Sequence, residues 1–281
     1  MSQNQSADNK RIAKNTLLLY FRMLLTIVLP VRIDCRERLD NLKAVLTWID
    51  KMEYPIILLE ADRSPKTNTL IEAFKHIRYH FVEDCQKVFH RTKYINDLLR
   101  MADTEYVAVW DADVILPYSQ IEEAVECLCS KTVAMVIPYN GTFYMLSPQQ
   151  STRFREQHDL LSLQYEKLFS PMGRTACGGI YLVHRKRYLS LGGDNEKFIG
   201  WGPEDAERLH RVQIAGEKVA WIDSGPLYHL HHERNDWSDV SLQQNLLAMQ
   251  KEFVKVCGFT QAELWAYIQT ELLPHSFSSQ P

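Results

Sequence analysis

Short apolar runs that alternate with helical patterns constrain the fold of this 281-residue chain more than any other feature. The runs TIVLPV (26–31), PIILLEAD (55–62) and YVAVWDADVIL (106–116) have the length and the mainly apolar character of buried strands. Between the first two, apolar residues recur at helical spacing, namely Leu39, Leu42, Val45, Leu46 and Ile49. This alternation predicts an α/β fold with a mainly parallel central sheet flanked by helices. Ligands of such sheets bind beyond the carboxyl ends of the strands.

The rest of the chain extends this pattern. We expect helices at 70–78, 91–102, 117–129 and 203–216, and strands at 79–84 and 132–140. We divide the chain into an N-terminal segment (1–25), a central domain (26–235) and a C-terminal helical extension (236–281). The apolar spacing of the extension favours packing against the domain and leaves a homodimer open.

Composition and charge exclude some classes of function. The chain has 32 Lys and Arg against 35 Asp and Glu and no basic block, so nucleic acid is not an expected partner. Its six cysteines are scattered without CxxC spacing, which favours a reducing, cytoplasmic environment. Arg22 interrupts the apolar run at 16–31, so we expect no spanning helix there. The basic N-terminal segment leaves open a peripheral contact with the inner face of a membrane.

A pair of carboxylates follows the apolar run at 107–110. Asp111 and Asp113 stand two residues apart, and their side chains point the same way if the chain is extended. Carboxylate oxygens suit Mg²⁺ or Mn²⁺, which fill their other positions with water and substrate phosphate. A lone pair of this kind is more often a solvated turn, but carboxylates beside a buried strand are costly to keep ionised without a cation or donors.

Glycines and acids gather in the second half of the chain. The pair Gly178 and Gly179 lets the backbone approach a ligand, and Trp201 lies between two further glycines that give its loop freedom to move. Glu204 and Asp205 open a predicted helix, where the helix dipole favours their ionised forms, so either can act as a base. Ordinary turns and helix capping are the alternative explanations for these residues.

Three histidines follow in YHLHH (228–232). In an extended strand His229 and His231 point to the same side, whereas His232 points away. Two imidazoles one residue apart can complete a metal site that carboxylates elsewhere in the chain begin. A packed or surface position is the alternative for each histidine.

Five segments carry a resemblance to a known family: FHRTKYINDLL, VAVWDADVILP, GGIYLVHRKRYLSLGG, FIGWGPEDAE and YHLHH. Their order resembles that of the β-1,4-galactosyltransferase-like enzymes and related bacterial capsule-type or chondroitin-type transferases. The resemblance extends from Thr26 to His232. It implies the GT-A fold of nucleotide-diphospho-sugar transferases, with the C-terminal helical tail outside the match.

The resemblance also implies donor-binding residues. Arg32, Phe89 and Arg91 look like the contacts to the uridine and diphosphate of a UDP-sugar. Asp111 looks like the residue that reaches the ribose or metal region. We place Gly179 beside the donor as well.

The catalytic and metal residues are implied in the same way. Asp113, His229 and His231 resemble the ligands of Mn²⁺ or Mg²⁺. Trp201 resembles the tryptophan of a mobile loop that closes over the donor. Asp205 is similar to the catalytic base and Glu204 to its acceptor-binding neighbour. Two departures, Pro203 in place of a glycine and Ala206 in place of a third acid, concern loop flexibility and acceptor choice.

The function implied is metal-dependent, inverting transfer of a sugar, galactose or N-acetylgalactosamine, from a UDP-sugar to a hydroxyl of a saccharide or lipid-linked glycan acceptor. Such a reaction serves the synthesis of surface polysaccharides or glycoconjugates. One alternative is a phosphohydrolase of the haloacid-dehalogenase type that uses Asp111 and Asp113. The other is a non-catalytic sugar-binding module in which Trp201 stacks on sugar, but this leaves the metal-type residues without a role.

Overall fold

The apolar runs form adjacent strands in a computed structural model, which describes residues 20–130, 132–163, 167–233 and 240–273. Within these residues, seven strands form the main sheet in the order β3-β2-β1-β4-β8-β6-β9. Their bounds are β1 (Leu25–Val31), β2 (Ile56–Asp62), β3 (Ile77–Glu83), β4 (Tyr106–Trp110), β6 (Met135–Ile137), β8 (Ile180–His184) and β9 (Val219–Trp221). The strands β3, β2, β1 and β4 are parallel, whereas β8 runs antiparallel to both β4 and β6. The expected α/β fold with a mainly parallel sheet is confirmed.

Burial explains why these runs are continuously apolar. Every residue of β1, β2 and β4 is buried, as expected for parallel strands covered on both faces. Val107, Ala108, Val109 and Trp110 are fully inaccessible, so the chain leaves β4 directly from the core. The carboxylates that follow are therefore held by a rigid strand end.

A second, three-stranded sheet forms at this strand end. It has the order β5-β10-β7, with β5 (Val114–Ile115), β7 (Phe143–Met145) and β10 (Leu227–His229). The expected single strand across 106–116 is thus divided, because Val114 N–H donates to the Asp111 carbonyl at 3.3 Å in a turn. Val114 then pairs with His229. This pairing brings the DxD segment beside the histidine segment.

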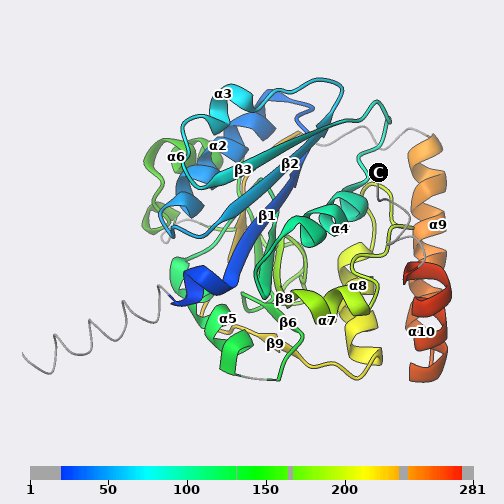
Figure 1. Ribbon diagram of the computed structural model, residues 1–281. Helices are drawn as coiled ribbons and strands as arrows, with labels where there is room; N and C mark the ends of the chain where they lie inside the picture. Colours follow the sequence, from blue (N-terminus) through cyan, green and yellow to red (C-terminus); the bar gives the residue numbers. More distant parts are fainter. Residues whose placement is uncertain (1–19, 131, 164–166, 234–239, 274–281) are drawn as a thin grey trace, which may run out of the picture.

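Helices flank the main sheet (Figure 1). They are α2 (Arg36–Asp50), α3 (Asn68–Ile71), α4 (Arg91–Met101), α5 (Tyr118–Ser130), α6 (Pro148–Gln157), α7 (Arg185–Ser190) and α8 (Glu204–Ile214), with short η1 (Leu161–Leu163). The helix expected at 70–78 is only the brief α3, and strand β3 begins at Ile77. None of the helices described is long and apolar enough to span a membrane.

The C-terminal residues form α9 (Val240–Cys257), α10 (Gln261–Tyr267) and η2 (Ile268–Leu272). These helices pack on the outer side of α8 (Figure 1). Met249, Val256, Leu264 and Ile268 are buried against the rest of the chain, whereas Leu247 and Val254, which belong to the same apolar spacing in α9, are 53% and 69% exposed. The proposed division into three segments stays a prediction, and residues 1–19 of the N-terminal segment lie outside the described residues.

Candidate active site

A carboxylate and two imidazoles meet at the carboxyl end of β4. The Asp113 carboxylate lies 3.5 Å from His229 Nε2 and 3.2 Å from His232 Nε2, on different oxygens. The three side chains are largely buried, with exposed fractions of 10%, 12% and 7%. Asp113 is fixed further because its carbonyl accepts a hydrogen bond from Leu230 N–H at 2.8 Å.

The geometry of this cluster fits a divalent cation. Two donors about 2.1 Å from one octahedral ion are about 3.0 Å apart, and the donor atoms of the cluster all lie within 4.8 Å of one another. Burial alone would raise the pKa of Asp113, but His229, His232 and Arg38 lower it well below its usual range. The carboxylate is therefore ionised, as a metal ligand must be. Its two imidazole neighbours suit a transition-metal ion better than Mg²⁺, which takes oxygen ligands.

The histidine pair differs from the sequence expectation. We expected His229 and His231 to point to the same side, but β10 ends at His229 and the alternation of side chains ends with it. His231 N–H donates to Ser151 Oγ at 2.8 Å, and His231 is not in the candidate metal group of the described residues. The prediction for His231 is therefore corrected: His232 faces Asp113 instead.

Asp111 is directed away from this cluster by the turn. It accepts a hydrogen bond from Arg91 Nε at 3.0 Å, and its N–H donates to the Gly179 carbonyl at 2.9 Å. Burial raises the pKa of Asp111 to about 6; Asp113 and Asp205 add to this, whereas Arg91 opposes it. The carboxylates of the two motifs are thus close enough to interact. The two members of the DxD pair have separate partners.

Asp205 and Glu204 begin helix α8 and differ in charge state. Burial raises the pKa of Glu204 to about 8, and the neighbouring Asp205 adds to this effect. Burial would also raise the pKa of Asp205, but Arg208 and Arg91 outweigh it and lower that pKa below its usual range. Asp205 Oδ1 accepts from Arg208 Nη1 at 2.8 Å, and its side chain is 31% exposed. Asp205 is therefore an ionised, accessible carboxylate beside a protonated one.

The chain leaves room for Asp205 at Gly178. A Cβ atom at this glycine would lie 2.1 Å from Asp205 Oδ2, closer than any side chain permits. The Gly178 carbonyl is held by the Tyr139 hydroxyl, which donates to it at 2.8 Å. The glycine pair therefore contacts both acidic residues: Gly178 faces the Asp205 carboxylate, and the Gly179 carbonyl accepts from the backbone N–H of Asp111.

Arg32 and Phe89 lie together next to the end of β2. The Arg32 guanidinium is 5.2 Å from the centre of the Phe89 ring and donates to the Ala61 and Gln86 carbonyls, each at 2.9 Å. It also pairs with Asp84. Phe89 stacks on Tyr94 at 5.4 Å, so the predicted donor contacts Arg32 and Phe89 lie side by side in the fold.

Trp201 lies on the loop just before α8. Its side chain is 60% exposed, and Gly200, which precedes it, has a φ of +85°. A Cβ at Gly200 would lie 2.7 Å from Val88, so the loop runs close to the segment that carries Phe89. This position suits a ring that stacks on a sugar, although its role stays a prediction.

Sequence reasoning missed several residues of this site. Arg208 lies one turn after Asp205 on α8, and this i, i+3 spacing of opposite charges was a readable signal. Arg38, 3.6 Å from Asp113, comes from α2, and Asp84 comes from the end of β3. Only the folded chain brings these two to the site.

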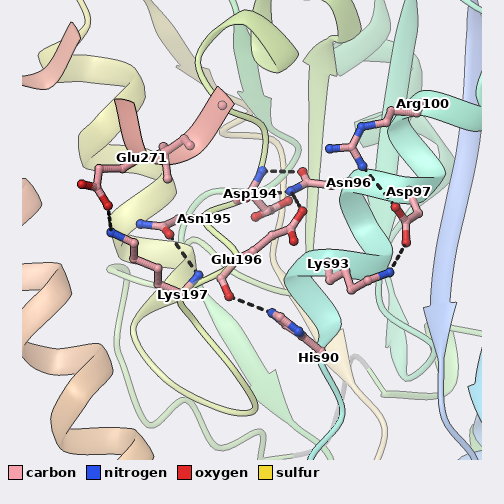
Figure 2. Close-up of a pocket in the computed structure, with 12 residues that line it drawn as sticks. His90, Lys93, Asn96, Asp97, Arg100, Asp194, Asn195, Glu196, Lys197 and Glu271 are labelled. Atoms are coloured by element: carbon pink, nitrogen blue, oxygen red, sulfur yellow. Dashed lines mark hydrogen bonds and ion pairs between the residues drawn. The ribbon is translucent and has the colours of Figure 1, made fainter. Parts of the chain in front are cut away.

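A pocket of about 370 Å³ lies between α4, the loop at 192–197 and η2 (Figure 2). None of the predicted site residues lines it. Its charged side chains are paired with one another, as in Lys93 with Asp97 at 2.7 Å and Lys197 with Glu271 at 2.9 Å. Asp194, one of its lining residues, contacts Arg208 and so connects the pocket to the candidate active site.

Comparison with known families finds a match to one segment within the second half of the chain. Residues 163–233 match the family model described as the N-terminal domain of galactosyltransferase. The match contains the glycine pair, Trp201, the acids Glu204 and Asp205, and the histidine segment. No curated protein sequence matches the chain.

Solved structures share the fold at low sequence identity. One is glucosyl-3-phosphoglycerate synthase from Mycobacterium tuberculosis in complex with Mn²⁺, UDP and phosphoglyceric acid, at 13% identity and a TM-score of 0.52, covering 84% of this chain and 79% of that one. The complex of the same enzyme with Mn²⁺, UDP-glucose and phosphoglyceric acid is 15% identical, has a TM-score of 0.53, and covers 84% of this chain and 80% of that one. Another is GalNAc-T7 with UDP, GalNAc and Mn²⁺, at 14% identity and 0.57, covering 88% of this chain and 54% of that one.

These likenesses bear on the alternatives that the sequence left open. The structures are glycosyltransferases of the GT-A fold, and they give no support to a phosphohydrolase of the haloacid-dehalogenase type. This chain spans about half the length of GalNAc-T7, and we therefore do not assign the activity of GalNAc-T7 to it. The chain therefore has the GT-A fold, and its residues 163–233 resemble the galactosyltransferases.

Proposed function

We propose that the protein transfers a sugar from a UDP-sugar to a hydroxyl of a saccharide acceptor, with inversion at the anomeric carbon. The observation that carries the proposal is the placement of an Asp–His–His cation site and an ionised, accessible Asp205 around Asp111. The Mn²⁺ and UDP present in the structurally similar enzymes support the choice of donor and metal. Galactose or N-acetylgalactosamine is the proposed sugar, because the family match is to a galactosyltransferase.

The protein binds the UDP-sugar at both ends of the donor, the uracil base and the sugar. Phe89 offers a ring face for the uracil base, and the guanidinium groups of Arg32 and Arg91 supply donors for the ribose and diphosphate. Asp113, His229 and His232 would hold Mn²⁺, which supplies positive charge that stabilises the leaving diphosphate. Trp201 would cover the sugar and exclude water.

The acceptor is activated by Asp205. Its carboxylate accepts the proton of the attacking hydroxyl as the oxygen bonds to the anomeric carbon from the face opposite UDP. The bond between that carbon and the UDP oxygen breaks, and UDP leaves with the electron pair. Glu204, which keeps its proton because its pKa is raised to about 8, can donate a hydrogen bond to the acceptor. An α-linked donor therefore yields a β-linked product.

The setting of the reaction is proposed from the sequence. A saccharide or lipid-linked glycan in the synthesis of a surface polysaccharide or glycoconjugate is the expected acceptor. All six cysteines are free, which supports the proposal of a cytoplasmic location. Contact of the N-terminal segment with the inner face of a membrane and a homodimer stay predictions.

The test is UDP release from a panel of UDP-sugars with Mn²⁺, with and without saccharide acceptors. We expect slow hydrolysis of one donor alone, faster release with an acceptor, and loss of both when a chelator removes the metal. The product formed with the best acceptor should carry a β-linkage. Release of inorganic phosphate from simple esters, with no UDP release from any donor, would contradict the proposal.

A further inference from the structure

The candidate base belongs to a chain of buried polar contacts that extends beyond the site described above. Arg208 presents its guanidinium to two carboxylates at once. Its Nη1 donates to Asp205 Oδ1 at 2.8 Å, whereas its Nε donates to Asp194 Oδ1 at 2.7 Å. Its side chain is only 1% exposed. The planar fork fixes the angle between these two contacts, so Asp194 determines where Nη1 points.

Asp194 is itself tightly held. Its second oxygen accepts a hydrogen bond from the Tyr181 hydroxyl at 2.5 Å, and Arg208 lies 4.0 Å above the ring of that tyrosine. Figure 2 shows Asn96 of α4 bonded to the Asp194 backbone among the residues that line the pocket. The Asn96 side chain accepts from Asp194 N–H at 2.7 Å and donates to its carbonyl at 2.8 Å. Each of these contacts restricts Asp194, and through it Arg208.

This arrangement solves an electrostatic problem of the site. Asp205 stands among other acids in a partly buried place, where carboxylates tend to take up protons. Several groups face it from different elements: Glu204 and Arg208 on α8, Arg91 on α4, Asp111 after β4, Tyr139 after β6 and Cys177 before β8. Of the cations among them, only Arg208 donates a hydrogen bond to Asp205 in the described part of the chain.

We propose that Arg208, anchored by Asp194 and Tyr181, is the positioning residue that keeps Asp205 ionised and aimed at the acceptor. The proposal rests on the function given above, in which Asp205 is the base. Arg208 holds Oδ1, which leaves Oδ2, the atom beside Gly178, to receive the proton. Without Arg208, Asp205 would take up a proton at a higher pH than in the wild type and would be free to turn.

The first test replaces Arg208 by Met and measures the pH profile of transfer. We expect kcat at pH 7 to fall at least about tenfold and the acidic limb to move up by about one pH unit or more, since an adjacent guanidinium lowers the pKa of an aspartate by about 1 to 3 units. Raising the pH should restore part of the rate, while KM for the UDP-sugar stays within about twofold. The matched control is Arg211→Met: Arg211 lies one turn later, is equally buried and pairs with Glu207 at 2.8 Å instead.

A second pair of variants, each of which removes a single hydroxyl, tests the role of Arg208 if Arg208→Met does not fold. Tyr181→Phe removes only the hydroxyl that donates to Asp194, whereas Tyr188→Phe removes a buried hydroxyl that has no hydrogen-bond partner among the described residues. The two rings are neighbours, 5.9 Å apart. We expect Tyr181→Phe to lower kcat by about three- to tenfold, the effect of one lost hydrogen bond, and to move the acidic limb slightly upward. Tyr188→Phe should leave both unchanged.

The outcomes separate this proposal from the one on which it rests. A wild-type pH profile and kcat in Arg208→Met, or identical kinetics in the two tyrosine variants, would overturn the role of Arg208 while Asp205→Asn stays inactive. Full transfer by Asp205→Asn would instead overturn the base assignment itself, and the role of Arg208 with it.

Discussion

Replacing His232 by Ala should weaken Mn²⁺-dependent binding of UDP far more than replacing its neighbour His231. His232 Nε2 lies 3.2 Å from the Asp113 carboxylate, close to the separation of about 3.0 Å expected for two ligands of one octahedral ion. His231 forms two hydrogen bonds through its backbone: its N–H donates to Ser151 Oγ, and its carbonyl accepts from Asn41 at 3.0 Å. These contacts survive truncation of the side chain to Ala.

The size of the effect follows from the number of ligands. Residues that merely orient a metal ligand are worth about 10- to 100-fold in metal affinity, so loss of one ligand of three should cost at least about 100-fold, or about 2.7 kcal/mol. Isothermal titration of UDP at a series of Mn²⁺ concentrations measures this directly. His231→Ala should stay within about threefold of wild type. A large loss in His231→Ala together with unchanged binding in His232→Ala would refute the assignment and restore the alternation expected from the sequence.

Three further variants test the acids and the loop. The pKa of Glu204 is raised to about 8 from its usual 4.5, so between these values the folded state holds a proton that the unfolded state has lost, and the protein loses stability as pH rises. Glu204→Gln should therefore become increasingly more stable than wild type from pH 5 to pH 8 in a series of melting curves. A difference in melting temperature that stays constant with pH would count against the burial argument. Gly178→Ala places a Cβ 2.1 Å from Asp205 Oδ2 and should lower kcat at least tenfold (about 1.4 kcal/mol) without loss of UDP binding. In the control Gly258→Ala, the atom nearest to the new Cβ lies 3.5 Å away, so kcat should be nearly unchanged. Equal kinetics in the two variants would contradict the close approach of Gly178 to Asp205. Trp201→Ala should raise UDP-sugar hydrolysis relative to transfer, because water then enters the donor site, and an unchanged ratio would argue against a covering role.

The fold could be predicted from the sequence because each strand and helix is marked by a pattern of apolar residues within its own segment. The runs at 26–31 and 55–62 are apolar throughout, since β1 and β2 are buried on both faces, and the intervening helix has one apolar stripe. The helix expected at 70–78 was mostly absent because nearby Ile77 pairs with β2 and begins a strand. Local propensity yields to sheet pairing there.

The candidate site was predicted in part, and its errors have a common cause. Alternation of side chains assigns a direction only within a strand, but Asp111 and Asp113 lie in a turn and His231 lies past the end of β10. The partners that decide the charge states come from distant segments, as Arg91 does for Asp111 and Asp194 does for Arg208. No spacing in one sequence encodes such long-range pairs, whereas Arg208 beside Asp205 was readable from helical spacing.

The account depends most on Asp205 as the group that takes the acceptor proton at an otherwise intact donor site. The direct measurement is sugar transfer by Asp205→Asn, with Mn²⁺-dependent UDP binding determined on the same preparation. General-base catalysis is worth about 10²- to 10⁴-fold, so transfer should fall by at least about 100-fold while UDP affinity changes by less than about threefold. Transfer at the wild-type rate with normal UDP binding would contradict the account.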